Sequence, residues 1–377
     1  MKVLQLLPAM QGGGVERGTI EIASAMQKEH IENLVVSAGG RLVPELKKAG
    51  VLHIALDVGS KNPLKWIKNI RALRRIIQDE KVTIVHARSR IPAWIAHFAL
   101  KKCPNVKFLT TFHGKYGTKP EWFKIPYNKI MVSGDKVISI SNFISQHIKE
   151  TYHVSDEKIR LIYRGADTNK FDPVLVSSLQ IEELIKKWQV PADKPVILMP
   201  GRLSRMKGHL VVLDALKQMK HKNVTCIFVG SAHGKSEFRD ELQQKINALD
   251  GQTTVLLLEH CDQMPTAYTI SSVVLSASLY PEAFGRTITE AQSMERIVVA
   301  TAHGGALETI EDGKTGFLVP VGDATALAET LDKVLDMPVS QREQIGKDAA
   351  ASVFQNFSIE QMCQKTLAVY RELDAEK

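Results

Sequence analysis

Short apolar runs alternate with helical patterns along almost the whole chain of 377 residues. The runs that predict strands are 3–7, 33–37, 84–85, 108–111 and 136–140 in the first half, and 196–199, 225–229, 254–258, 273–276 and 297–300 in the second. Helical patterns lie between them, for example 17–28, 65–78, 208–219 and 236–249. Such alternation is typical of α/β proteins, in which helices cover both faces of a parallel sheet. Two sets of strands predict two Rossmann-like domains.

Residues 165–173 read G-A-D-T-N-K-F-D-P and are rich in turn formers, so a domain boundary is expected there. We assign 1–170 to a first domain and 171–358 to a second. The amphipathic segment 359–377 follows the last strand of the second domain, and we expect it to pack back on the first. Ligands of open parallel sheets bind beyond the carboxyl ends of the strands. The two domains are therefore expected to face each other across a ligand-binding cleft.

Composition places the chain among globular proteins of a reducing compartment. Hydrophobic residues make up 44% and charged residues 24%, which are ordinary values. The four cysteines are far apart and form no C-x-x-C pair, so neither a zinc site nor a disulfide framework is predicted. No apolar run reaches the roughly 18 residues that span a bilayer. We interpret the start, M-K-V-L-Q-L-L-P, as a first strand, and we expect a cytoplasmic protein.

The charge is unevenly distributed between the two halves. Residues 1–170 contain 28 Lys and Arg against 14 Asp and Glu, whereas 171–377 contain 21 against 27. The first half therefore carries a net charge of +14 and the second of −6, which together give the +8 of the whole chain. A basic half suggests an anionic partner, for which nucleic acid, anionic lipid and a phosphorylated glycan are candidates, although surface lysines without any partner are equally compatible.

The motif with the most chemical content is S-L-Y-P-E-A-F-G-R-T-I-T-E at 278–290. Glu282 and Glu290 stand eight positions apart around Phe284-Gly285, between a predicted strand and a predicted helix. Carboxylates at such a turn can accept hydrogen bonds from hydroxyl groups, while the helix N-terminus attracts phosphate. This combination suits a nucleotide sugar.

Two further turns carry groups that suit a diphosphate. Gly201-Arg202 and Lys207-Gly208 follow the strand 196–199, and their two cations can clamp a diphosphate, although a basic loop is more often only solvated. Gly12-Gly13-Gly14 follows the first strand, where glycines allow close approach of a ligand, or only a tight turn. The spacing is not G-x-G-x-x-G, which argues against an NAD-dependent oxidoreductase.

His113 follows the strand 108–111 directly and precedes Gly114, so it is a candidate functional residue as well as a structural one. The chain contains no D-x-D motif, the carboxylate pair through which many sugar transferases hold a divalent ion. Charge on a leaving diphosphate would then be balanced by Arg202, Lys207 and helix N-termini.

Taken together, these residues resemble the retaining glycosyltransferases of family 4, which have the GT-B fold. The resemblance covers nearly the whole chain and rests on Gly12–Gly14, His113-Gly114, V-I-S-I-S at 137–141, R-G-A-D at 164–167, Gly201-Arg202 with Lys207-Gly208, Glu282-x7-Glu290, and Gly304-Gly305 with Glu308. The stretches H-A-R-S-R-I-P-A-W at 86–94 and P-E-A-F-G-R-T at 281–287 are similar to bacterial members that build lipopolysaccharide core or related cell-surface glycans.

The resemblance implies a role for each matching position. Its catalytic set is His113, Arg202, Lys207 and Glu282, with His113 against the donor sugar, the two cations on the diphosphate and Glu282 on sugar hydroxyls. Glu290 would bind the ribose, and Cys261 to Met264 would lie near the base. The remaining donor-binding positions are Gly13, Gly14, Ala283, Phe284, Gly285 and Arg286. No metal and no other cofactor is implied. Glu259-His260 and Glu295 depart from the family pattern, since many relatives have glycine there.

The function expected from the resemblance is metal-independent transfer of a glycosyl group, with retention, from a UDP- or GDP-sugar to an acceptor hydroxyl. The acceptor is expected to be an anionic glycolipid or glycan bound by the basic first domain. Residues 61–75 combine an apolar stripe with a basic face, which predicts either a core-packed helix or a surface against anionic lipid. The loop 115–124 is a second candidate for such a surface. We therefore expect peripheral attachment to the inner face of the cytoplasmic membrane.

Two alternatives remain open. A GT-B enzyme with a soluble acceptor, such as a sucrose- or trehalose-forming synthase or a sugar phosphorylase, would share the same donor motifs. A basic nucleic-acid-binding protein belongs to a different class, but no nucleic-acid-binding module is recognisable, and we expect no nucleic-acid partner.

Overall fold

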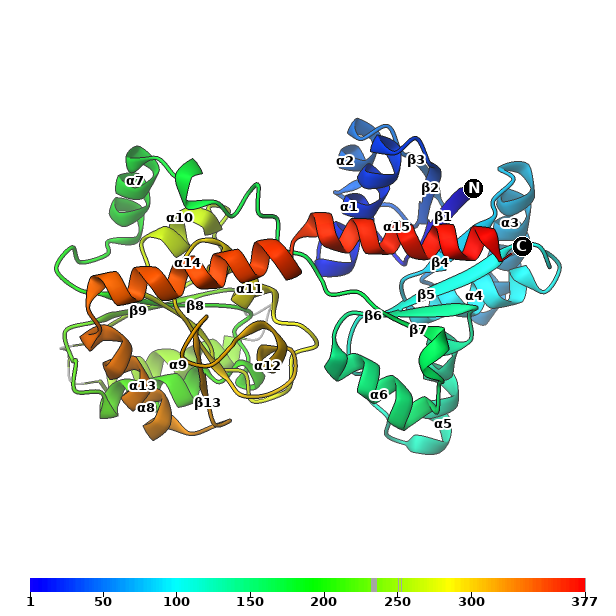
Figure 1. Ribbon diagram of the computed structural model, residues 1–377. Helices are drawn as coiled ribbons and strands as arrows, with labels where there is room; N and C mark the ends of the chain where they lie inside the picture. Colours follow the sequence, from blue (N-terminus) through cyan, green and yellow to red (C-terminus); the bar gives the residue numbers. More distant parts are fainter. Residues whose placement is uncertain (232–235, 250, 252, 377) are drawn as a thin grey trace. The chain divides into compact units, whose positions relative to one another are not determined.

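The computed structural model describes residues 1–231, 236–249, 251 and 253–376 (Figure 1). The chain forms two compact units, residues 1–163 with 360–377 and residues 164–359. Each described unit contains one parallel sheet, with seven strands in the first and six in the second. The expected α/β class with two Rossmann-like sheets is confirmed.

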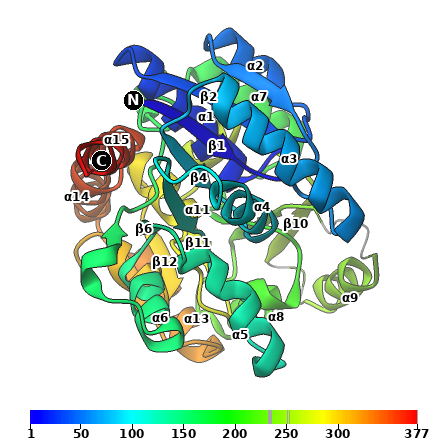
Figure 2. The same cartoon turned by 90° about the vertical axis from the view of Figure 1, so that its right-hand side faces the viewer.

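The sheet of the first unit has the strand order β3-β2-β1-β4-β5-β6-β7. Its strands are β1 (Lys2–Leu6), β2 (Glu32–Ser37), β3 (Leu52–Ala55), β4 (Ile84–Ala87), β5 (Lys107–Phe112), β6 (Lys136–Ser139) and β7 (Ile159–Leu161). Its helices are α1 (Gly14–Lys28), α2 (Val43–Lys48), α3 (Pro63–Asp79), α4 (Arg90–Leu100), α5 (Glu121–Asn128), α6 (Asn142–Tyr152) and α15 (Ile359–Ala375), with short 3₁₀ helices η1 (Lys129–Val132) and η2 (Asp156–Lys158). Figure 2 shows α3 and α4 side by side.

Helix α15 packs on the sheet of the first unit through polar contacts as well as apolar ones. The hydroxyl of Tyr370 lies 2.7 Å from Nδ1 of His86, which is completely buried on β4. Nε2 of the same histidine lies 2.7 Å from the hydroxyl of Thr111 on β5. Glu372 pairs with Lys136 at 3.2 Å and also with Arg160. These contacts tie the C-terminal helix to strands far away in the sequence.

The sheet of the second unit has the order β10-β9-β8-β11-β12-β13. Its strands are β8 (Val196–Pro200), β9 (Thr225–Val229), β10 (Thr254–Leu258), β11 (Val273–Ser276), β12 (Val298–Thr301) and β13 (Phe317–Val319). Its helices are α7 (Ser178–Trp188), α8 (His209–Gln218), α9 (Ser236–Asn247), α10 (Met264–Thr269), α11 (Arg286–Ser293), α12 (Ala306–Thr309), α13 (Ala324–Asp336) and α14 (Val339–Asn356), with η3 (Pro173–Leu175) and η4 (Arg205–Lys207).

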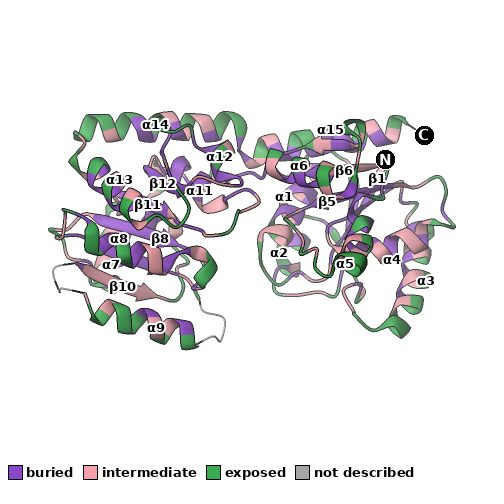
Figure 3. Cartoon of the chain, turned by 90° about the horizontal axis from the view of Figure 1, so that it is seen from below, coloured by how far each residue is buried: buried purple, intermediate pink, exposed green. Residues whose placement is uncertain are grey.

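The strand β8 illustrates why this sheet is buried on both faces. Ile197 and Met199 point into one apolar cluster, which includes residues of α8 and α13. Val196 and Leu198 point into another, which includes residues of α7 and α11. A central parallel strand covered on both sides reads as a continuous apolar run, which is how the sequence revealed it. Figure 3 shows the buried strands and the exposed outer faces of the helices.

The predicted strands lie within two residues of the observed ones, but three strands were missed. The missed strands β3, β7 and β13 each form an edge of their sheet. They contain only three or four residues, so each is too short to show a strand pattern, and β3 and β7 are also partly exposed and interrupted by His53 and Arg160. Helix α1 begins at Gly14, three residues before the predicted start. The sequence pattern missed this first turn because it begins with glycine, which has low helix propensity.

The segments 164–166 and 357–359 pair with each other within the second unit. The amide of Ala166 donates to the carbonyl of Phe357 at 2.8 Å, and the amide of Ile359 donates to the carbonyl of Ala166 at 2.9 Å. A Cβ atom on Gly165 would lie 2.4 Å from the backbone of Ile359. Only glycine therefore allows the two segments to lie this close together.

Candidate active site

The turn after β8 presents Lys207 at the carboxyl end of the sheet. Gly208 has φ +80°, in the left-handed region, and caps the N-terminus of α8. A Cβ atom on Gly208 would lie 1.9 Å from the carbonyl oxygen of Ala277, which follows β11. The glycine thus serves both the backbone conformation and the close contact between the turns after β8 and β11. As a result, these two turns hold their side chains against each other.

Lys207 and Glu282 form an ion pair across these turns. Lys207 Nζ donates to Glu282 Oε1 at 2.6 Å, and the hydroxyl of Ser278 donates to the same oxygen at 2.6 Å. The two side chains are about one-quarter exposed, at 25% and 24%. Burial alone would raise the pKa of Glu282, but the ammonium group and both hydrogen bonds outweigh it and hold the pKa below its ordinary value. Glu282 is therefore an anion at neutral pH.

The pair lines a cavity of about 410 Å³. Arg202, which is exposed, and Ala283 also line it. Within the described part of the chain, no carboxylate forms an ion pair with Arg202. The cavity therefore combines one neutralised cation, one cation without a paired carboxylate and one ionised carboxylate. Tyr280 and Met206 add exposed apolar surface to its wall.

The loop that carries Glu282 rests on the turn after β12. The amide of Gly305 donates to the carbonyl of Glu282 at 2.9 Å, and a Cβ atom on Gly304 would lie 2.4 Å from the same oxygen. His303 lies close enough for its charge to lower the pKa of Glu282 further. The sequence identified the two glycines but missed His303 and Ser278 as neighbours of the glutamate, because contacts between different turns leave no spacing signal.

Glu290 belongs to a second cluster, in helix α11. The Tyr268 hydroxyl donates to Glu290 at 3.3 Å, and Arg286 Nη2 donates to the same carboxylate at 3.2 Å. Burial raises the pKa of Glu290, although Arg286 and Tyr268 oppose this effect. Among the described residues, no hydrogen bond or ion pair joins this cluster to the Lys207–Glu282 pair, and Tyr268 was not identified from the sequence.

Gly285 and Phe284 place the start of α11. Gly285 has φ +87° and caps the helix, while the Phe284 side chain is buried against Phe357. The amides of the first turn of α11, which begins at Arg286, therefore lie at a helix N-terminus, where backbone N–H groups lack partners within the helix. The donor-binding role of Ala283 to Arg286 stays a prediction.

Cys261 and Met264 lie apart from the Lys207–Glu282 pair. Both are partly buried against the cluster that also contains Trp188. Cys261 lines a separate hollow of about 350 Å³ beside α7, and burial raises the pKa of its thiol. The two residues of this region that differ from the family pattern each contact a charged partner: Glu259 contacts Arg239, and His260 contacts Asp262. Glu295 has φ +56°, a conformation that glycine adopts more readily.

The remaining predicted residues belong to the first unit. His113 directly follows β5, and its backbone is hydrogen-bonded to the Tyr116 phenol. Gly13 caps α1, and Gly14 is the first residue of that helix. The loop before them is anchored by the turn after β2, where the Met10 amide donates to the carbonyl of Gly39 at 2.8 Å. These residues all lie at the carboxyl end of the first sheet.

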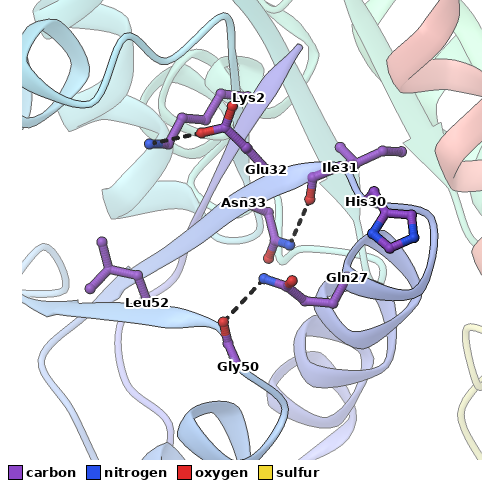
Figure 4. Close-up of a pocket in the computed structure, with 8 residues that line it drawn as sticks. All are labelled: Lys2, Gln27, His30, Ile31, Glu32, Asn33, Gly50 and Leu52. Carbon is purple, nitrogen blue, oxygen red and sulfur yellow. Dashed lines mark hydrogen bonds and ion pairs between the residues drawn. The ribbon is translucent and has the colours of Figure 1, made fainter.

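A hollow of about 350 Å³ lies at the opposite, amino end of the first sheet (Figure 4). Several of its polar groups are engaged with one another or with neighbouring backbone. Gln27 donates to the carbonyl of Gly50, and Lys2 pairs with Glu32 and Glu80. None of the residues that line this hollow was predicted to belong to the active site.

The fold, with one parallel sheet in each unit, matches that of GT-B glycosyltransferases, and comparison of the sequence with known families identifies the same class. Residues 12–170 match Glycosyltransferase Family 4, and residues 180–352 match Glycosyl transferases group 1. The chain therefore belongs to this glycosyltransferase family, as the sequence motifs predicted. None of the helices in the described part of the chain has the length and apolar character required to span a bilayer.

Particular relatives cover the chain from end to end. It is 40% identical to a glycosyltransferase from Rickettsia africae ESF-5, whose crystal structure superposes with a TM-score of 0.91 over 99% of this chain and 98% of that one. Anabaena Alr3699/HepE in complex with UDP-glucose gives 25% identity and a TM-score of 0.81, over 99% and 100%. The capsular polysaccharide biosynthesis glycosyltransferase CapM of Staphylococcus aureus is 25% identical, over 98% of this chain and 96% of CapM.

Proposed function

We propose that this glycosyltransferase takes its sugar from a nucleoside diphosphate donor bound in the cavity of the second unit. The observation that carries the proposal is the Lys207–Glu282 ion pair beside Arg202. Arg202 and Lys207 supply positive charge for a diphosphate, and Glu282 supplies a carboxylate that accepts hydrogen bonds from sugar hydroxyls. The relative HepE has been crystallised with UDP-glucose, which supports a UDP-sugar as the first donor to test.

The proposed chemistry relies on charge at the leaving group. When the bond from the anomeric carbon to the diphosphate breaks, negative charge builds up on the phosphate and positive charge on the sugar. Fixed cations stabilise that state more than the ground state, and loss of one comparable contact lowers rates by about 10²–10³. We propose that Arg202 and Lys207 provide this stabilisation without a metal ion, with His113 of the first unit against the donor sugar.

Retention of configuration is part of the proposal. The leaving phosphate would take the proton of the acceptor hydroxyl on the same face of the sugar that it leaves, so no protein carboxylate has to act as nucleophile. The proton moves from the acceptor oxygen to the phosphate oxygen while the new glycosidic bond forms. NMR of the first product formed in the presence of EDTA tests both points. An inverted anomer would exclude retention, and loss of turnover that Mg²⁺ restores would exclude metal independence.

Glu290 is proposed to bind the ribose and to set affinity for the donor. Its carboxylate already accepts hydrogen bonds from Tyr268 and Arg286, which fix its orientation. Gly13 and Gly14 at the start of α1 would approach the diphosphate from the first unit. Cys261 and Met264 remain proposed neighbours of the base.

We further propose that the acceptor is a cell-surface glycan or glycolipid at an anionic membrane. The relative CapM acts in capsular polysaccharide biosynthesis, and the first unit contains the excess of positive charge. In α3, Leu73 is buried, whereas Leu64 and Ile67 are exposed beside Lys65 and Lys68. The core-packed interpretation of 61–75 is therefore right only for the second half of this helix.

A second exposed apolar pair, on helix α5, supports membrane binding as well. Trp122 and Phe123 of α5 are exposed, Trp122 by 81%, and Lys124 lies over the Phe123 ring at 5.7 Å. Exposed aromatic residues beside lysines favour the interface of an anionic bilayer. We propose that the enzyme binds the inner face of the cytoplasmic membrane through α3 and α5.

A further inference from the structure

Arg90, the first residue of α4, lies at the carboxyl end of the first sheet in a tightly defined setting. Its guanidinium carbon lies 4.5 Å from the ring centroid of Tyr116 and 5.7 Å from that of Tyr127. Nη1 donates to Oδ1 of Asn128 at 3.0 Å. Asn128 is fully buried and donates in turn to the carbonyl of Gly117 at 3.1 Å. The guanidinium is therefore fixed before any ligand arrives.

The positive charge of Arg90 is not neutralised. Across the described residues, no carboxylate lies in ion-pair contact with it, and its one hydrogen bond goes to a neutral amide. Burial raises the pKa of Tyr116 to about 12 against the opposing effect of Arg90, and it also raises the pKa of Tyr127. Both phenols therefore stay neutral near pH 7. An arginine held by aromatic rings and an amide keeps donors of its planar fork for a carboxylate or phosphate.

Arg90 is connected through Tyr116 to His113, the residue predicted to lie against the donor sugar. The phenol of Tyr116, on whose ring the guanidinium lies, is hydrogen-bonded to the backbone of His113. The exposed Lys115 adds a second cation on the same loop. Ser89, the N-cap of α4, makes no capping hydrogen bond with its side chain, so the helix start adds a partial positive charge. All of these features favour an anion near His113 within the first unit.

We infer that Arg90 binds an anionic group of the acceptor, a phosphate or carboxylate carried on the sugar that receives the transfer. This inference rests on the proposed function and assigns the part of the acceptor that the first unit recognises. Because the guanidinium is already ordered, little conformational freedom is lost on binding, and the bidentate geometry favours an anionic sugar over a neutral one. Arg90 thereby determines specificity for the acceptor and has no part in binding the donor.

The test compares three matched probes, glucose, glucuronate and glucose 6-phosphate, with inorganic phosphate as a fourth. Dissociation constants are measured by calorimetry for the full chain saturated with UDP, and UDP affinity is measured separately. The variants are Arg90→Met, which removes the charge, and Arg90→Lys, which keeps it without the fork. Lys101→Ala is the matched control, since Lys101 lies over Phe98 at 5.2 Å at the other end of α4.

The wild-type chain is expected to bind at least one anionic sugar about 10-fold or more tightly than glucose, a difference of about 1.4 kcal/mol or more. Arg90→Met should lose this preference, Arg90→Lys should keep part of it, and Lys101→Ala should keep all of it, with UDP affinity unchanged throughout. Glucuronate and glucose 6-phosphate distinguish a carboxylate from a phosphate, and inorganic phosphate shows whether the anion binds without the sugar.

Several outcomes overturn the inference. A wild-type chain without preference for either anionic sugar does so, as does a preference that survives in Arg90→Met. If Arg90→Met does not fold, Arg90→Lys decides, because an unchanged preference in that variant contradicts recognition by the planar fork. Failure of the proposed function looks different, since no nucleotide sugar would then be consumed by the wild-type chain, whatever these probes show.

Discussion

Lys207 and Glu282 are 75 positions apart in the sequence, yet the ammonium nitrogen and the carboxylate oxygen lie 2.6 Å apart. The contact exists because Gly208 brings the turn after β8 against Ala277, just beyond β11. The pair has two consequences. It keeps Glu282 ionised inside a cavity, and it holds the lysine at a fixed place beside that carboxylate.

The pair should be visible in the pH dependence of stability. The folded state lowers the pKa of Glu282, so its stabilisation is present above the ordinary carboxyl pKa of about 4.3 and is lost as the pH falls through the lowered folded value. In Lys207→Met, the ammonium group is absent, so burial should raise the pKa of Glu282 instead. Urea unfolding from pH 3 to 7 should therefore show a difference that grows with pH to about 1–2 kcal/mol. A difference that is independent of pH would contradict this origin.

Glu290 should behave in the opposite way. Its folded pKa is raised by burial, so its contribution to stability is fully present below pH about 4.3 and is lost as the pH rises through the raised value. Glu290→Gln should therefore unfold at the same temperature as the wild type or higher at pH 7.5. Its KM for the donor should rise about 10–100-fold, as expected if 1.4–2.8 kcal/mol of ribose binding is lost. An unchanged KM would contradict the proposal that Glu290 binds the ribose of the donor.

Gly208 should tolerate no side chain. Gly208→Ala places Cβ 1.9 Å from the Ala277 carbonyl, so we expect a loss of about 1–3 kcal/mol in unfolding free energy together with loss of activity. Gly313→Ala is the matched control, because Gly313 has φ +78° and no heavy atom within 4 Å of its added Cβ. The control isolates the backbone strain from the clash. Equal losses in both variants would show that the contact with Ala277 has no effect.

Sequence periodicity predicted the central strands because both of their faces are covered by helices. The edge strands β3, β7 and β13 were missed because strands of three or four residues are too short to carry such a pattern. The candidate residues Arg202, Lys207 and Glu282 stood out because they lie in dense motifs directly after strands, and Glu290 stood out through its spacing from Glu282. The partners Ser278, Tyr268 and His303 were not assigned to their roles, because their proximity arises from packing between turns.

The basic helix 61–75 shows another limit of sequence patterns. One stripe contains Leu64, Ile67 and Leu73, yet only Leu73 is buried. Hydrophobic periodicity shows which side chains share a helix face, but it does not show how far the neighbouring helix extends along that face. The exposed first turns could therefore be recognised only in the folded chain.

If Trp122 and Phe123 contact the membrane, removing their rings should weaken binding to anionic vesicles. Trp122→Ala combined with Phe123→Ala should reduce co-sedimentation with vesicles containing phosphatidylglycerol by at least about 10-fold, because about 1.5–3 kcal/mol of apolar burial is removed for each ring. Consumption of the nucleotide sugar in solution should not change. Phe354→Ala is the control, since Phe354 is exposed in the second unit. Binding that is equally strong to neutral phosphatidylcholine vesicles would contradict the role of the lysines.

The central claim is that Lys207 and Glu282 bind a nucleotide sugar. The most direct measurement is the release of nucleoside diphosphate from a panel of UDP-, GDP- and ADP-sugars, carried out with the wild type and with Lys207→Ala. We predict release from at least one donor by the wild type, together with a decrease of about 10²–10³ in the variant, which should stay folded with the loss of about 1–2 kcal/mol expected from the broken ion pair. Release by the folded variant at the wild-type rate would contradict the account, as would a wild type that consumes none of the donors.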